Sequence, residues 1–275
     1  MDYFKNRIII IASGHQKHKV IQPLVEGKLG AICMIPERYD TDKFGTFSGE
    51  VEREVDAITT LRKKILSALD EFGVDMGIGS EGSFGQHPFI PFSAADEELV
   101  MLIDRKNNFE IGASYLTEQT NYLQRTVNTL DELNQFATEV HFPSHALLIK
   151  STDGTIVKKG IDNWNQLVAI ANQQNLGENK LQVETDMRAM HNPMRMEAIK
   201  KATELLIEKL LIECPNCHAP GFDVQEKIPG LPCEWCSTPS IYTKTLLRKC
   251  WRCSHTQHAD IDKKLPARFC EVCNP

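Results

Sequence analysis

The sequence predicts an α/β protein: a core domain with a mixed, largely parallel sheet, followed by a C-terminal double zinc-ribbon module. Three observations support this fold class. Strand-like and helix-like segments alternate over residues 7–79, in the order that gives right-handed crossovers and parallel strands. A hairpin pattern at residues 99–116 extends the sheet with antiparallel strands, and a second hairpin at residues 145–159 gives that part of the chain an α+β character. Finally, eight of the nine cysteines form four CxxC pairs within residues 214–273.

The chain of 275 residues is long enough for one substantial core and a small appendage. We therefore predict a core domain at residues 1–192, a connecting helix at 193–213 and a zinc-binding module at 214–275. The short apolar run at residues 8–12 is too brief for a secretory or membrane segment, so we expect a cytoplasmic location and no membrane partner. The formal net charge of −6 argues against general attraction to nucleic acid.

The first strand is expected at residues 7–13, because four consecutive isoleucines are β-branched and typical of a buried strand. An amphipathic segment follows at residues 17–26, and a second buried strand at residues 30–36. A helix is expected over residues 50–72, where apolar side chains recur at helical spacing. Residues 76–79 then read as the third strand.

Polar side chains gather in loops at the predicted carboxyl ends of these strands, where α/β sheets bind their ligands. The first loop carries His15 and Lys17. The glycine-rich segment at residues 79–88 is expected to be a loop whose backbone amides can approach an anion. It contributes Glu81 and His87, which could hold a divalent cation or move a proton. The alternative is a tight turn in which Glu81 only caps nearby amides.

The expected start of the second helix adds further carboxylates. Glu50 or Glu52 could join Glu81 in holding a catalytic Mg²⁺ or Mn²⁺, with His15 or His87 as the proton carrier. The alternative to metal binding is that Glu50 and Glu52 only complement the dipole of the helix.

Two arginines beyond the sheet are candidates for holding an anion. Arg188 and Arg195 could grip a phosphate or carboxylate as planar forks, and an internal ion pair with Glu184 or Asp186 is the alternative. The complete set of candidate ligand-binding residues is Lys17, Ser80, Gly82, Ser83, Arg53, Arg188 and Arg195.

Capping signals mark one helix in the second half of the core domain and the start of the connecting helix. Thr129 and Glu132 form a capping box, which predicts a helix start. Asn192 is expected to cap, and Pro193 to begin, the helix that leads to the first cysteine pair.

Each CxxC pair places two thiolates on a tight turn where both can reach one metal ion, and the spacing predicts two structural zinc sites. Such closed sites should fold the module without taking part in chemistry. Loop closure favours sequential pairing, first pair with second and third with fourth, over interleaved pairing. Iron, bound as in rubredoxin, is the alternative to zinc in these sites. Disulfides between the cysteines are not expected in a cytosolic protein. The predicted ligands are Cys214, Cys217, Cys233, Cys236, Cys250, Cys253, Cys270 and Cys273.

Several motifs together resemble a bacterial family known as domain of unknown function 6671. They are GTFSGEVER at residues 45–53, GSEGSFGQHPFIPF at 79–92, FPSHALLI at 142–149, ETDMRAMHNPMRM at 184–196, and the closing CPNC, LPCEWC, CWRC and CEVCNP. The resemblance covers nearly the whole chain and implies no particular reaction.

The N-terminal part is more weakly similar to the inosine/xanthosine triphosphatases. That family has a lysine after the first strand, a Thr-Leu-Arg helix start and a Gly-Ile-x-Glu-Gly strand end. The counterparts here are Lys17, residues 60–62 and residues 77–82. Gly14 stands where that family has asparagine, and two lysines at residues 63–64 replace small residues near the substrate. This similarity implies a nucleotide as ligand.

Two functions of different classes follow from these patterns. In the first, the core domain binds a phosphate-bearing small molecule, such as a nucleotide, and hydrolyses it with a divalent metal ion. In the second, the protein is a non-catalytic adaptor whose zinc ribbons bind protein or nucleic acid. The basic cluster of the tail, Arg248, Lys249 and Arg252, would then contact phosphates; the alternative, which we favour, is a solvated surface that binds no phosphate.

Overall fold

The computed structural model describes residues 3–37, 39 and 56–274 of the chain. These residues form two compact units: one comprises Phe4–Leu206, and the other joins Tyr3 to the residues from Ile207 onward. The division falls inside the long helix α5 (Pro193–Leu211), within the segment predicted as a connecting helix. None of the helices in the described ranges combines the length and the apolar character needed to cross a membrane.

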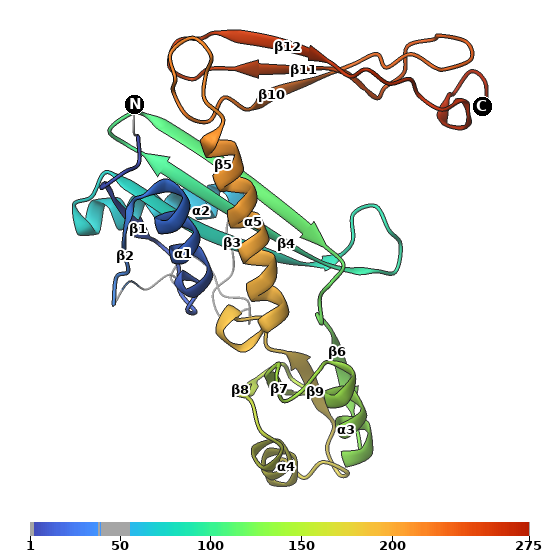
Figure 1. Cartoon of the computed structure of the whole chain (residues 1–275). Coiled ribbons are helices and arrows are strands. Elements are labelled where there is room, and N and C mark those ends of the chain that lie inside the picture. The colour runs from blue at the N-terminus through green and yellow to red at the C-terminus, as the bar shows by residue number, and fades with distance from the viewer. Residues whose placement is uncertain (1–2, 38, 40–55, 275) are drawn as a thin grey trace. The chain divides into compact units, whose positions relative to one another are not determined.

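The larger unit contains a five-stranded sheet in the order β2-β1-β3-β4-β5 (Figure 1). β1 (Ile8–Ile11) lies between β2 (Ile32–Met34) and β3 (Met76–Gln86), and these three strands are parallel. β4 (Ala94–Asp104) and β5 (Phe109–Thr117) continue the sheet as an antiparallel hairpin. The predicted α/β class with a mixed sheet is confirmed. Parallel pairing occurs where helices join the strands, because a crossover must return the chain in the same direction.

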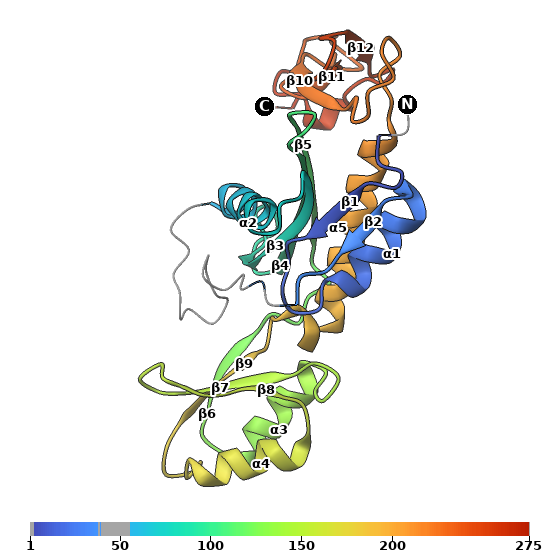
Figure 2. The ribbon, with the colours of Figure 1, turned by 90° about the vertical axis from the view of Figure 1, so that its left-hand side faces the viewer.

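Helices cover both faces of this sheet (Figure 2). α1 (His18–Leu29) and the first part of α5 lie on one face, and α2 (Ala57–Phe72) lies on the other. Each of the first two helices ends at a glycine in the left-handed conformation, Gly30 after α1 and Gly73 after α2, as helix ends commonly do.

α2 packs closely on the strands beneath it. Its N-terminus is capped by Asp56, whose carboxylate accepts the N–H of Thr59 at 3.0 Å. Gly77 and Gly79 of β3 allow the close approach, because a Cβ at either position would lie 2.9 Å from an apolar side chain of α2. The start expected for this helix, at residues 50–55, lies outside the described residues.

The glycine-rich segment at residues 79–88, expected to be a loop, is strand for most of its length. β3 continues to Gln86 and pairs residue by residue with β4, so that Gly82 lies opposite Glu98. Glycine weakens an isolated strand, but here the antiparallel partner and the packing on both faces override that preference. The expectation of a loop was therefore wrong except for residues 87–88.

A second sheet in the larger unit is wholly antiparallel, in the order β6-β9-β7-β8, and packs around its own hydrophobic core. The predicted helix start is confirmed: the Thr129 hydroxyl accepts the N–H of Glu132, and the Glu132 carboxylate accepts the N–H of Asn128, one residue before the cap. Its elements are β6 (Gln124–Val127), α3 (Leu130–Glu139), β7 (Leu147–Ser151), β8 (Ile156–Ile161), α4 (Trp164–Gln173) and β9 (Leu181–Thr185).

The smaller unit is built on a three-stranded antiparallel sheet of β10 (Val224–Pro229), β11 (Thr243–Lys249) and β12 (Thr256–Asp260). Each strand follows the previous one along the chain and reverses its direction. The four CxxC pairs lie beyond the strand ends, so that successive pairs alternate between the two ends of the sheet.

Candidate functional site

The four CxxC pairs assemble into two clusters of four thiols. The first cluster joins the pairs 214/217 and 250/253, and the second joins 233/236 and 270/273, with all ligand atoms of a cluster within 4.8 Å of one another. Neighbouring Sγ atoms from different pairs lie 3.6 to 3.8 Å apart. This matches the roughly 3.8 Å edge of a sulfur tetrahedron around zinc with Zn–S of about 2.3 Å. Each cluster can therefore hold one structural metal ion, and its donor set is consistent with zinc.

The sequential pairing expected from loop closure was wrong, because the clusters are interleaved. In an antiparallel meander, alternate turns lie at the same end of the sheet, so the first pair meets the third and the second meets the fourth. Interleaving roughly doubles the loop between paired knuckles, which costs only about 0.6 kcal/mol. The hydrogen bonds of the sheet outweigh that difference.

The two clusters differ in their surroundings. The first is covered by aromatic side chains: Trp251 donates its indole N–H to the carbonyl oxygen of Pro220 at 2.8 Å and meets the Tyr3 ring edge-on at 6.5 Å. The second is more open to solvent, because Cys236 is exposed and Trp235, in the same knuckle, is 77% exposed.

In the larger unit, five of the predicted site residues lie near the carboxyl end of β1, but on two faces of the sheet. Side chains alternate along β3, so Glu81 and Ser83 face α2, whereas Ser80 and Gly82 face the opposite side. Lys17, just before α1, donates a hydrogen bond to the backbone of β3, and α1 lies on the face of the sheet opposite α2. The strand thus separates residues that were predicted to form one site.

On the α2 face, Glu81 forms a buried ion pair with Lys64. Its Oε2 accepts a hydrogen bond from the Lys64 Nζ at 2.6 Å, and both side chains are less than a tenth exposed. Desolvating two charges is costly, so buried pairs are uncommon and are often found at functional sites. Lys64 was not among the predicted site residues, although it lies on the stripe of α2 that carries Leu61 and Ala68 toward the sheet.

A cavity of about 290 Å³ lies beside Glu81, between the N-terminus of α2 and the strands β3, β4 and β5. The first turn of α2 contributes to its wall, and the peptide N–H groups of a helix N-terminus favour anions. Carboxylates, hydroxyls and apolar groups all line the cavity: Asp56, Ala57, Ile58, Glu81, Ser83, Glu97, Leu99 and Ser114.

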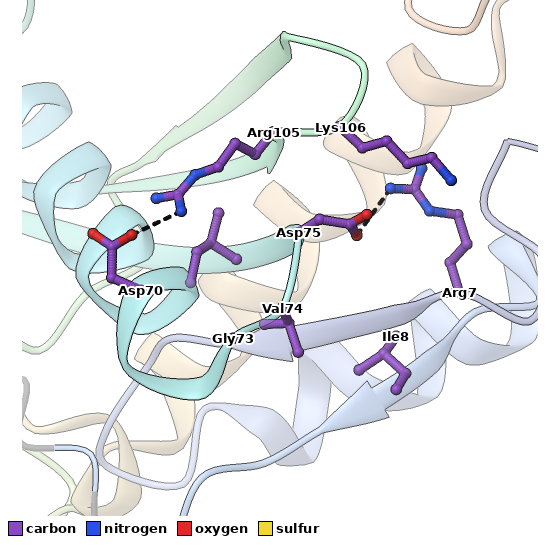
Figure 3. Close-up of a pocket in the computed structure, with 9 residues that line it drawn as sticks. Arg7, Ile8, Asp70, Gly73, Val74, Asp75, Arg105 and Lys106 are labelled. Atoms are coloured by element: carbon purple, nitrogen blue, oxygen red, sulfur yellow. Dashed lines mark hydrogen bonds and ion pairs between the residues drawn. The ribbon is translucent and has the colours of Figure 1, made fainter.

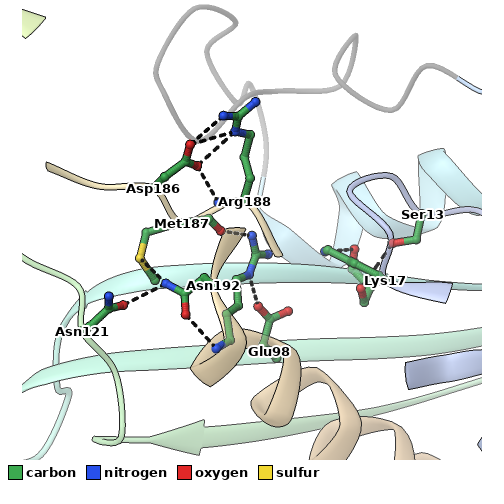
Figure 4. Close-up of polar contacts among 10 residues, drawn as sticks. Ser13, Lys17, Glu98, Asn121, Asp186, Met187, Arg188 and Asn192 are labelled. Carbon is green, nitrogen blue, oxygen red and sulfur yellow. Dashed lines mark hydrogen bonds and ion pairs between the residues drawn. The ribbon is translucent and has the colours of Figure 1, made fainter. Parts of the chain in front are cut away.

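On the opposite face, the Lys17 ammonium is buried and donates a hydrogen bond to the carbonyl oxygen of Ser80 at 3.2 Å (Figure 4). Burial, reinforced by the positive charge of Arg195, lowers the pKa of Lys17 to about 8. The hydroxyls of Ser13 and Ser80 lie 3.4 Å apart beside it.

Arg195, in the first turn of α5, lies in the same buried region and has no solvent exposure. Its Nε donates to Glu98 Oε1 at 2.6 Å, and its Nη1 donates to the carbonyl oxygen of Met187. The guanidinium also lies over the Phe84 ring, 5.0 Å from the centroid.

Arg188 makes the internal ion pair that was one of its two predicted roles. Its Nη2 lies 2.6 Å from Asp186 Oδ2, and its Nε donates to the same carboxylate (Figure 4). Asn192 acts as predicted: its Oδ1 accepts the N–H of Arg195 and so caps α5. His145 supports the same helix end, because its Nε2 accepts the N–H of Met194.

Two buried carboxyl groups of β4, Asp96 and Glu98, lie in the same charged cluster as Lys17 and Arg195. The sequence analysis missed both. Burial, and then the neighbouring Glu98 charge, raise the pKa of Asp96 to about 8, so this group is largely protonated at neutral pH. Within the described part of the chain, Asp96 Oδ1 and Glu98 Oε2 have no hydrogen-bond partner. Their alternation with the buried Val100 was the signal that could have revealed them.

Of the remaining predicted residues, His87 does not join Glu81 in the described ranges. His87 lies six residues farther along an extended chain, which corresponds to roughly 20 Å. His15 lies between β1 and α1, where its backbone is left-handed with φ of 56°. Glu50, Glu52 and Arg53 lie outside the described residues.

A second hollow, of about 650 Å³, lies at the amino ends of β1 and β3 (Figure 3). Its arginines are held by carboxylates: Arg7 contacts Asp104 at 2.5 Å and Asp75 at 3.1 Å, and Arg105 contacts Asp70 at 2.7 Å. These ion pairs hold the amino ends of β1 and β3 in place. They lie at the end of the sheet opposite Lys17, Glu98 and Arg195.

Comparison with known proteins places the chain in one family. No curated protein and no solved structure matches the chain, so the similarity to inosine/xanthosine triphosphatases is unsupported. The model of one protein family, described as a domain of unknown function, matches residues 64–275. This range includes β3 and β4, α5 and both cysteine clusters. The chain therefore belongs to the family of the domain of unknown function DUF6671.

Proposed function

We propose that the larger unit binds a phosphate-bearing small molecule, such as a nucleotide, near the carboxyl end of β1. The observation that carries this proposal is the concentration of buried charge there, with Lys17, Lys64 and Arg195 as cations and Glu81 and Glu98 as anions. α1 joins β1 to β2 on one face of the sheet and α2 joins β2 to β3 on the other, and α/β sheets bind their ligands at the carboxyl ends of such parallel strands. Buried charges beside a cavity favour a binding role over a purely structural one.

In this proposal, the cavity at the start of α2 receives the phosphate. Its wall includes the hydroxyl-bearing residues Ser83 and Ser114 and the first turn of α2, where a phosphate would replace the Asp56 carboxylate at the N–H of Thr59. Lys64 lies next to it through its contact with Glu81. Lys17 adds positive charge from the other face of β3.

We further propose that a divalent cation, Mg²⁺ or Mn²⁺, assists hydrolysis. Hard cations prefer carboxylate oxygens, and Glu81 and Glu97 both line the cavity. A cation that arrives with the phosphate would replace the Lys64 ammonium at Glu81 and leave Lys64 to neutralise the phosphate. The cation, when bound, polarises the phosphoryl group and stabilises the charge that develops on it.

Release of phosphate or pyrophosphate from a panel of nucleotides and sugar phosphates, with Mg²⁺ or Mn²⁺, tests this proposal. We expect turnover by the purified protein and its loss in Glu81→Gln. The matched control is Glu139→Gln, which changes an exposed carboxylate on α3 and should keep the activity. Calorimetry with the same panel separates the two parts: binding without turnover rejects hydrolysis, and the absence of binding rejects both.

A second candidate function is that of an adaptor whose smaller unit binds protein or nucleic acid. The observation that favours it is the exposure of Trp235, Phe269 and Val272 around the second cysteine cluster, since exposed aromatic groups mark many interaction sites. If nucleic acid is the partner, neutralising Arg248, Lys249 and Arg252 should reduce the salt dependence of retention on single-stranded nucleic acid. Retention that persists unchanged excludes the basic cluster as its cause.

A further inference from the structure

The tip of the β3–β4 hairpin, residues 87–93, exposes three large apolar side chains. Phe92 is 99% exposed, Phe89 is 83% exposed and Ile90 is 44% exposed. Single exposed apolar residues are common on protein surfaces, but three within four consecutive positions form a concentrated patch. The hairpin connects two long, buried strands, so this patch belongs to a well-supported element.

Hydrogen bonds hold the tip in one conformation. The Nδ1 atom of His87 accepts hydrogen bonds from the N–H groups of Phe89 at 3.1 Å and Ile90 at 3.0 Å. The backbone N–H of His87 donates to the carbonyl oxygen of Ser93 at 2.8 Å. Two prolines, at residues 88 and 91, restrict the backbone further. A preorganised tip loses little conformational entropy on binding, which favours a role in recognition.

The charge of the tip indicates the chemistry of its partner. Apart from His87, residues 82–95 contain no ionisable side chain, so the tip offers nothing to a charged ligand. Loops that dock on anionic lipid surfaces carry lysine or arginine beside their apolar groups, and this chain has a net charge of −6. An apolar protein surface suits the tip better than a membrane does.

The size of the patch narrows the choice further. Two phenylalanines and one isoleucine expose on the order of 450 Å². That is well below the roughly 800 Å² per partner of a stable interface, so the tip alone is too small to hold two copies of this chain together. It is the size of the buried anchor at the centre of a larger interface.

We propose that residues 87–93 are a docking anchor that inserts Phe89 and Phe92 into an apolar pocket of a different protein. The role is independent of phosphate binding near Glu81. His87 then serves as the brace that shapes the anchor, rather than as a proton carrier.

A photo-crosslinking residue placed at position 92 in the full-length protein, expressed in cells, tests the proposal. We expect one protein adduct at position 92. Position 130 is the control, because Leu130 is another partly exposed apolar side chain, on α3, and the same crosslinking residue placed there should give no such adduct. The protein identified in this way is then purified, and its affinity for each variant is measured by calorimetry. Phe89→Ser with Phe92→Ser should weaken binding at least about 100-fold, and Leu130→Ser should leave it unchanged.

Other outcomes overturn the proposal. An adduct with twice the mass of the chain identifies a second copy as the partner. Binding to vesicles of phosphatidylcholine and phosphatidylglycerol that is lost in the double variant identifies a lipid surface. The absence of a position-specific adduct, or equal affinity of wild type and double variant at equal melting temperature, removes the anchor role.

Discussion

Arg195 Nε donates a hydrogen bond to Glu98 Oε1 at 2.6 Å, and neither side chain has any solvent exposure. This contact joins the first turn of α5 to the middle of β4, and the second hydrogen bond of Arg195, to the Met187 carbonyl, extends it to the segment after β9. One side chain thus connects the two sheets of the larger unit.

Arg195→Met should lower the free energy of unfolding by about 3–5 kcal/mol, because it leaves the Glu98 carboxylate buried without its counter-ion. The matched control is Arg105→Met, which breaks an exposed pair with Asp70 and should cost about 0–1 kcal/mol. Urea denaturation, followed by circular dichroism, gives both values. Equal effects of the two substitutions would contradict the importance of the buried pair.

Gly82→Ala should destabilise the larger unit by about 1–3 kcal/mol. A Cβ at this position would lie 2.5 Å from Glu98 Oε1 and 2.7 Å from Arg195 Nη2, so the ion pair must shift to admit a methyl group. Gly85 lies on the same strand with nothing within 4 Å of its Cβ position, which makes Gly85→Ala the control. Thermal melting should show a lower melting temperature for Gly82→Ala alone. Equal decreases in both variants would indicate that alanine destabilises β3 at either position.

The raised pKa of Asp96 predicts a dependence of stability on pH. In the folded state its carboxyl group keeps its proton up to a pKa of about 8, whereas in the unfolded chain it ionises at its ordinary, lower pKa. The folded state therefore binds more protons between these values, and this group's contribution to stability falls as pH rises from about 4 to about 8.

Asp96→Asn removes this titration. The free energy of unfolding of the variant should fall less than that of the wild type between pH 5 and pH 8, by an amount on the order of a few kcal/mol. Denaturation series at several pH values measure the difference between the two proteins, which cancels the contribution of the other titrating groups. Identical slopes would show that Asp96 is ionised in the folded protein.

The interleaving of the cysteine clusters can be tested by counting metal ions. Cys217→Ser with Cys250→Ser removes two ligands from the same cluster, so the double variant should keep one zinc ion per chain. Cys217→Ser with Cys233→Ser removes one ligand from each cluster and should weaken both sites. Sequential pairing predicts the reverse pattern. Native mass spectrometry distinguishes these stoichiometries directly.

Much of the fold could be predicted because local patterns and tertiary packing agree. The four isoleucines that begin at Ile8 form β1, and the apolar spacing before Gly73 forms the described part of α2. Thr129 and Asn192 cap their helices because the side-chain oxygens needed at those positions act locally. The cysteine ligands were equally readable, since CxxC spacing fixes two donors within one turn.

The rest depended on contacts between distant residues. The glycines and serines of β3 resemble a loop when they are considered alone, and they form a strand because β4 and Arg195 pack against them. Lys64 looks like a surface residue until Glu81 is placed opposite it. The pairing of Cys217 with Cys250 follows from the direction of the strands, which loop lengths do not reveal.

The interleaved clusters also set the order in which the two sets of four thiols are completed during translation. All four thiols of the first cluster have been made once Cys253 leaves the ribosome, whereas the second cluster is complete only 20 residues later, at Cys273. One end of the small sheet can therefore be fixed by a metal ion while the other end is still being synthesised. A chain that terminates between these two cysteines would keep all four thiols of the first cluster and lack at least one thiol of the second.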